Sequence, residues 1–334
     1  MERIPSLDGL RAISITLVVL GHLGKSGHAP LIFKSYYTDL GVDLFFVISG
    51  YLITTILLKE HRLTSTISLR DFYIRRAFRI FPAALVFMSL AFIVYWHQFR
   101  WYNIVAALLY VSNFDSTRPW IFGQLWSLGV EEQFYLLWPS VLKRWHKHRI
   151  VILAGVTVLA PVGQSALYLL KVPGGNYGTW PAVASTLAAG CLLGALNPVL
   201  PKVGKWTALI LFLVLLFIPL FAANSAGKTL FQLFVLLPVR HLSMAGLLLH
   251  VVQMPYRLLN WGPVVWIGRI SYSLYLWQQP FCADPSLHSA YLAFLAVAFA
   301  AFSYYCVEKP MLRLRDTQTR RELDVPKIES MKSA

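Results

Sequence analysis

Long apolar stretches alternate with short polar segments along most of the chain. A helix needs about 20 mostly apolar residues to cross the hydrocarbon core of a bilayer. A shorter apolar stretch, residues 102–113, predicts a re-entrant or interfacial segment. The pattern therefore predicts an all-α, polytopic transmembrane bundle of about ten helices. The ten predicted spans are residues 7–24, 40–58, 80–98, 124–142, 150–170, 181–199, 206–223, 229–251, 263–281 and 288–306.

The composition and the placement of basic residues agree with a membrane protein. Only 13% of the residues are charged, against about 25% in a soluble domain. With a cytoplasmic N-terminus, the inside segments hold 21 of the 30 lysines and arginines, the outside segments hold 6 and the spans hold 3. Cytoplasmic loops carry an excess of basic residues. We therefore expect both termini in the cytoplasm, a transmembrane domain over residues 1–310 and a basic cytoplasmic tail over residues 311–334.

The net charge of +15 would also suit a nucleic-acid-binding protein. Such a protein gathers its basic residues in one patch, whereas here they are spread over loops between apolar stretches. The expected partner is therefore anionic membrane lipid and not nucleic acid. Cys191, Cys282 and Cys306 lack metal-ligand spacing, so no metal site is predicted. Because the first apolar stretch contains Arg11 and His22, we expect a retained helix and not a cleaved signal peptide.

Ionisable side chains in the first two spans mark a candidate site, because charge inside a bilayer is costly and usually functional. Arg11 and His22 are close to three helical turns apart, so they share one helix face and lie about 16 Å from each other along the axis. Asp43 is expected at the depth of His22, where a carboxylate can orient an imidazole. The alternatives are an interfacial histidine without a role and a carboxylate that stabilises a helix N-terminus.

Two further polar elements lie inside predicted spans. Ser49, Gly50 and Tyr51 follow Asp43 in the second span, and the glycine permits a close approach to the backbone. The fourth span carries the adjacent Glu131 and Glu132, which point about 100° apart around a helix. We expect at least one of these glutamates to meet an arginine or a water-filled cavity. The alternative is ion pairing that only holds the bundle together.

Arg75, Arg76 and Arg79 form a basic cluster at the end of the loop that precedes the third span. One helical turn separates Arg76 from Arg79, and guanidinium groups on adjoining surface can hold phosphate groups by forked hydrogen bonds. The cluster therefore predicts an anion site at the cytoplasmic face. The alternative is simple anchoring of the chain by positive charge.

These elements together resemble the acyltransferase 3 family of integral membrane acyltransferases, from Pro5 to about Pro310. No single element is decisive, but their shared order on a chain of ten predicted helices is specific. The segments that carry the resemblance are Leu7–Ala12, Gly21–His22, Gly41–Leu52, Arg75–Pro82, Leu125–Tyr135, Gly268–Trp277 and Val307–Pro310.

The resemblance implies transfer of an acyl group, often acetyl, from acyl-CoA to a sugar or another hydroxyl. Acyl-CoA would be a donor substrate, with no permanently bound cofactor. The arginine and histidine of the family's first helix match Arg11 and His22. Its cytoplasmic arginine pair matches Arg76 and Arg79, and its late glutamate matches Glu308. The family's serine-glycine-aromatic element matches Ser49, Gly50 and Tyr51, with tyrosine where phenylalanine is common.

On this basis we expect Arg76 and Arg79, with Arg75, to hold the CoA phosphates, beside Ser49, Gly50 and Tyr51. His22 would act as general base or transient acyl carrier, with Asp43 orienting it. Arg11 would line the channel or stabilise the thioester carbonyl. Glu131, Glu132 and Glu308 would be structural or line the channel.

Many members of the family carry an additional soluble esterase-like domain, and a stand-alone form is expected here. The acceptor would then be a carbohydrate or lipid-linked glycan met at the outer face, or a separate protein would complete the transfer. The expected location is the bacterial inner membrane. The competing hypotheses are a polytopic transporter without acyl-transfer chemistry and a scaffold protein. Against a transporter, the two halves of the sequence show no convincing similarity.

Overall fold

The computed structural model describes residues 5–25, 36–170, 180–223, 231–283, 291–315 and 317. Over these residues the chain is helical and contains no strand, as the sequence predicted. The main helices are α1 Pro5–Lys25, α2 Tyr36–Thr64, α3 Leu69–Tyr95, α4 Trp101–Leu108, α5 Leu125–Trp145, α6 Arg149–Leu169, α7 Trp180–Leu196, α8 Lys205–Ala223, α10 Leu237–Gln253, α11 Gly262–Cys282 and α12 Leu292–Ser303. The described residues also contain two π-helical segments, η7 Gln232–Leu236 and η8 Tyr304–Glu308. The short 3-10 segments are η2 Trp96–Gln98, η3 Ser112–Phe114, η4 Trp120–Phe122, η5 His146–His148 and η6 Asn197–Val199.

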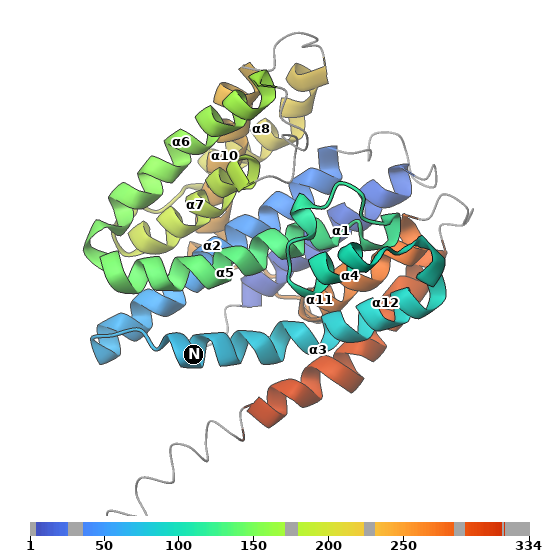
Figure 1. Cartoon of the computed structure of the whole chain (residues 1–334). Helices are drawn as coiled ribbons and strands as arrows, with labels where there is room; N and C mark the ends of the chain where they lie inside the picture. The colour runs from blue at the N-terminus through green and yellow to red at the C-terminus, as the bar shows by residue number, and fades with distance from the viewer. Residues whose placement is uncertain are drawn as a thin grey trace, which may run out of the picture.

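Each of the ten predicted spans coincides with one of these helices, and the short apolar stretch forms α4 and η3. Six segments among the described residues are long and apolar enough to cross a membrane, and two shorter apolar helices accompany them. Helices α3 and α5 run in opposite directions, and the short helices between them connect their ends (Figure 1). The tail predicted over residues 311–334 lies almost wholly outside the described residues.

Helix α3 corrects the sequence prediction in one respect that matters for function. It begins at Leu69, eleven residues before the expected start of the third span. The Ser68 hydroxyl accepts a hydrogen bond from the Asp71 N–H and caps the helix there. Arg75, Arg76 and Arg79 therefore belong to the helix itself and not to a preceding loop. Hydropathy places the end of a span at such charges, because the sequence alone does not reveal the acidic side chains that neutralise them.

Helix α1 packs between α2 and α11, and α2 packs in turn against α7. In Figure 1, α6, α7, α8 and α10 gather on one side of α2, while α11 and α12 lie on the other. Close approach between these helices requires small residues. A Cβ atom on Gly268 of α11 would lie 1.9 Å from the backbone oxygen of Asp8 in α1. The two helices touch there through their backbones.

The α2–α7 interface is equally close. A Cβ atom on Gly50 would lie 2.4 Å from the Leu187 carbonyl oxygen, and one on Gly190 would lie 2.2 Å from the Val47 carbonyl oxygen. The close approach predicted at Gly50 is therefore made by helix α7. The neighbouring Tyr51 side chain is buried in the same interface, where its hydroxyl accepts a hydrogen bond from Asn197.

We expect Gly50→Leu and Gly190→Leu each to lower the midpoint of thermal unfolding by roughly 1–4 °C, because overpacking a tight interface costs about 1–3 kcal/mol. The measurement is a fluorescence melt of the purified protein in detergent. Gly155→Leu is the matched control, since no atom lies within 4 Å of the added Cβ on α6. Equal melting of all three variants would contradict this account of the interface.

Candidate active site in the bundle

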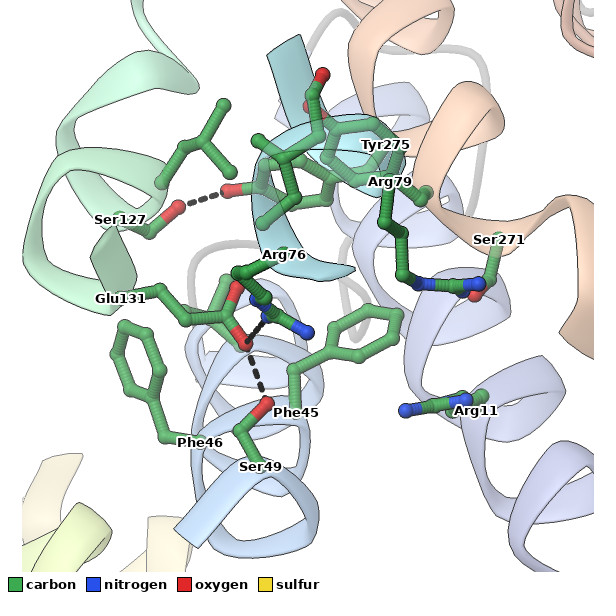
Figure 2. A pocket seen from close by; sticks show the side chains of 14 residues that line it. Arg11, Phe45, Phe46, Ser49, Arg76, Arg79, Ser127, Glu131, Ser271 and Tyr275 are labelled. Atoms are coloured by element: carbon green, nitrogen blue, oxygen red, sulfur yellow. Dashed lines mark hydrogen bonds and ion pairs between the residues drawn. The ribbon is translucent and has the colours of Figure 1, made fainter. Parts of the chain in front are cut away.

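A cavity of about 70 Å³ lies inside the bundle where α1, α2, α3, α5 and α11 meet. That volume holds a few water molecules. Its polar wall gathers five of the twelve candidate site residues named from the sequence (Figure 2). They are Arg11, Ser49, Arg76, Arg79 and Glu131, and Tyr275 of α11 joins them.

Three arginines from two helices reach this cavity. Arg11 comes from α1, and Arg76 and Arg79 come from one face of α3, where they are three residues apart. The Arg75 side chain points elsewhere. It is 40% exposed and lies 3.5 Å from the carboxylate of Glu60 on α2. The expected grouping of three adjacent arginines is therefore wrong for Arg75, because consecutive residues on a helix point in different directions.

Arg76 is held by both glutamates of α5. Its guanidinium nitrogens lie 3.8 Å from Glu131 and 3.9 Å from Glu132, and its planar end stacks 3.4 Å above the ring of Tyr135. The prediction that at least one glutamate meets an arginine is confirmed for both. Figure 2 shows the ends of the Arg76 and Glu131 side chains beside each other, joined by a dashed line.

Glu131 also anchors α2 to α5. Its carboxylate accepts short hydrogen bonds from the hydroxyls of Ser49 and Tyr135, and the Tyr135 hydroxyl lies 3.0 Å from the Ser49 oxygen. Ser49 is therefore part of the cavity wall, as Figure 2 shows. Its neighbours Gly50 and Tyr51 are not part of that wall and face α7 instead.

Arg79 and Arg11 each have an acidic partner of their own. Arg79 lies 3.6 Å from Glu308, a completely buried residue in the π-helical segment η8 that also accepts a hydrogen bond from Ser273. Arg11 lies 3.8 Å from Asp8, one turn earlier on α1. Each cavity arginine is thus balanced by a carboxylate. Buried charge is stable only when it is paired in this way.

The structure does not support the expected depth match between His22 and Asp43. Gly21 packs against Thr38, whereas Gly41 packs against the Ser14 backbone, so Asp43 lies roughly two turns nearer the N-terminus of α1 than His22 does. The cause is that α2 begins before the predicted start of its span, at residue 36. Asp43 is therefore well inside the helix and not at its end.

Asp43 instead joins α2 to α10. Its carboxylate forms a close ion pair with Arg240, and the ring nitrogen Nε2 of His241 lies 3.8 Å away. His241 is held in turn by the hydroxyls of Ser185 and Thr186, at 3.1 Å and 2.7 Å. Arg240 could have been noticed in the sequence as a cation inside an apolar stretch, but its partner could not.

His22 has a neutral amide beside it. Its Nδ1 atom lies 2.6 Å from Oε1 of Gln278 on α11. Sequence reasoning missed Gln278, because a glutamine inside an apolar helix carries no charge to draw attention. Among the described residues, no group of three or more histidines, cysteines, aspartates or glutamates is arranged to hold a metal ion.

A helical bundle with many exposed apolar side chains and a buried, ion-paired polar cavity fits a membrane protein, in which ionisable groups face the bundle interior and are paired. A family model described as an acyltransferase domain matches residues 4–284. The chain therefore belongs to the acyltransferase 3 family of integral membrane proteins, as the resemblance predicted.

Curated relatives give the family a more specific context. The chain is 32% identical to the peptidoglycan O-acetyltransferase OatA of Listeria monocytogenes, over 83% of this chain and 49% of OatA. It is 28% identical to the putative peptidoglycan O-acetyltransferase YrhL of Bacillus subtilis, over 99% of this chain and 58% of YrhL. The chain thus spans about half the length of these relatives. No solved structure matches it.

We expect Arg240→Leu to destabilise the protein strongly, because removing one partner of a buried ion pair costs about 3–5 kcal/mol. Asp43→Leu should do the same. The double variant Asp43→Leu/Arg240→Leu should recover much of the loss, since it leaves neither charge in the interior. Thermal melts of the three variants in detergent measure this coupling, with Arg269→Leu as the control at an exposed arginine. Additive losses in the double variant would argue against a direct pair.

Proposed function

We propose that this chain is a membrane-embedded O-acyltransferase that moves an acyl group, most simply acetyl, from cytoplasmic acyl-CoA to a hydroxyl of a cell-envelope glycan. The observation that carries the proposal is the arginine-lined cavity, which lies along the same α1 face as His22 in a chain of the acyltransferase 3 family. The peptidoglycan O-acetyltransferases among its relatives support peptidoglycan as the class of acceptor.

The orientation follows from the distribution of basic residues. The connection between α2 and α3, with Arg62, Arg70 and Arg75 nearby, would face the cytoplasm, as would both termini. The His22 end of α1 would then face the outside of a bacterial inner membrane. Donor and acceptor would enter from opposite ends of the bundle and meet between them.

The cavity arginines are suited to the donor. Arg11 lies about 16 Å along α1 from His22, too far for both to act on one reacting carbonyl, so the arginines would line the path of the donor and bind its polar groups. Arg11 and Arg79 face the cavity with side chains 20% and 31% exposed. Since the cavity is much smaller than CoA, the phosphates of the donor would bind nearer the cytoplasmic end. Arg79 could reach them by leaving Glu308.

Arg76 has a different part in the proposed reaction. Two glutamates and the Tyr135 ring hold its guanidinium, so it has little freedom to follow a ligand. We assign it to keeping α3 and α5 in register. His22, about 16 Å along α1 from Arg11, would take the proton from the acceptor hydroxyl as a general base.

The deciding experiment uses the full chain in nanodiscs with radiolabelled acetyl-CoA and soluble peptidoglycan fragments as acceptor. We expect wild-type protein to label the glycan and His22→Ala to lose about 100-fold or more in kcat, as removal of a general base does. No labelling and no CoA binding by the wild type would contradict the proposal and favour a transport function.

We further expect Arg79→Gln to raise the KM for acetyl-CoA by roughly 10-fold, because one charge-assisted contact to the donor is worth about 1.5–3 kcal/mol. Arg75→Gln is the matched control on the same helix, since its side chain points to Glu60 and away from the cavity. The measurement is acetyl transfer at varied acetyl-CoA. A larger change of the KM in Arg75→Gln than in Arg79→Gln would contradict this assignment and indicate that the donor binds at the outer face of α3.

A further inference from the structure

His22 and Gln278 come from opposite ends of the chain and meet where α1 packs along α11. The distance of 2.6 Å between His22 Nδ1 and Gln278 Oε1 is that of a strong hydrogen bond. Gln278 is completely buried, so its amide cannot turn freely in solvent. Close backbone packing at Gly268 fixes the position of α11 against α1.

A chain of amide groups sets the direction in which Gln278 points. The Trp120 carbonyl oxygen can only accept a hydrogen bond, and the Gln279 Nε2 atom donates to it at 2.7 Å. The Oε1 atom of Gln279 then faces Nε2 of Gln278, at 3.4 Å. Because Nε2 of Gln278 faces Gln279, the Oε1 atom of Gln278 faces His22. A backbone carbonyl thus determines, through two side-chain amides, which atom the imidazole meets.

The direction of this chain determines where the proton of His22 lies. An amide oxygen only accepts hydrogen bonds, so the neighbouring Nδ1 atom must carry the hydrogen. In neutral imidazole the lone pair then lies on Nε2. We infer that Gln278 is the positioning residue that holds His22 as the Nδ1–H tautomer and directs Nε2 toward the acceptor hydroxyl. This inference deepens the proposed function and rests on it for the role of His22.

The location of the pair agrees with this role. On α11, Ser271, Tyr275 and Gln278 follow the i, i+4, i+7 spacing of a single helix face, and the first two line the cavity. On α1, Arg11 and His22 also share a face, and Arg11 lines the cavity. The His22–Gln278 pair therefore lies on the same faces of the two helices that line the cavity, further along each helix.

The proposed step is balanced as follows. The acceptor hydroxyl gives its proton to Nε2 of His22, and its oxygen forms a bond to the acyl carbon of the thioester. The carbon–sulfur bond then breaks, and the CoA thiolate takes the proton from Nε2. The Nδ1 hydrogen stays on His22 throughout, donated to Oε1 of Gln278. A neutral amide orients the ring without adding a negative charge, so it leaves the resting imidazole uncharged and able to accept the proton.

The first test is kinetic and uses the full chain in nanodiscs with acetyl-CoA and peptidoglycan fragments. Gln278→Leu should lower kcat by about 10–100-fold, the usual cost of losing a group that orients a reactive histidine, with little change in the KM for acetyl-CoA. Gln278→Glu should stay active, with the acidic limb of its kcat/KM profile moved to higher pH by about one unit. A glutamine remote from the reacting histidine would not move that limb.

The second test reads the tautomer directly. Nitrogen NMR of ¹⁵N-histidine-labelled protein, with His22→Ala to assign the signal, should show His22 protonated at Nδ1 in the wild type and a mixture of tautomers in Gln278→Leu. Gln253→Leu is the control, because Gln253 also makes hydrogen bonds through its amide but does so at the far end of α10. It should change neither the tautomer nor kcat.

The outcomes separate the inference from the proposed function. Wild-type His22 protonated at Nε2, or a Gln278→Leu variant with unchanged kcat and pH profile, would overturn the positioning role while leaving the transferase proposal intact. Unchanged turnover in His22→Ala would instead overturn the catalytic role of His22. In that case the NMR measurement would still decide whether Gln278 determines the tautomer of the His22 ring.

Discussion

The pairing of charge inside an apolar bundle is the constraint on which the rest of this structure depends. A guanidinium away from water is tolerated only beside a carboxylate or another strong acceptor. Arg76, Arg79 and Arg240 each find such a partner on a distant helix. These pairs fix which helices are neighbours. The cavity exists where several of them converge, at the meeting of α1, α2, α3, α5 and α11.

This constraint also limits what the cavity arginines can do for a ligand. An anion that binds to an already paired arginine must replace a carboxylate. The net free energy of binding is therefore only the difference between the new ion pair and the old one. Arg76, with two glutamates and an aromatic ring, is fixed in place, whereas Arg79 has a single carboxylate and a more exposed side chain. The two arginines look alike in the sequence. Their surroundings, and not their identity, divide the roles that we propose for them.

The helical architecture was predictable from hydropathy, and so was much of the cavity. Arg11, Ser49, Arg76, Arg79 and Glu131 were all named from the sequence, because buried polar residues in apolar stretches are conspicuous. Pairings between them were harder to predict. The expected depth of Asp43 in the membrane depends on where α2 begins. Because α2 begins a few residues earlier than predicted, Asp43 pairs with Arg240 and does not lie level with His22. Gln278 carried no charge, and only the tertiary contact shows its relation to His22.

The early start of α3 has a consequence for how the protein is made. Inserting an arginine at the centre of a helix into the membrane costs about 2.5–3.5 kcal/mol, and α3 carries several near one end. The glutamates that neutralise Arg76 lie on α5, and the one beside Arg79 is in η8, close to the end of the described chain. During synthesis α3 therefore leaves the ribosome long before its acidic partners. Its arginine-bearing turns must wait in the interface or in the translocon, so the cavity closes among the last events of biogenesis.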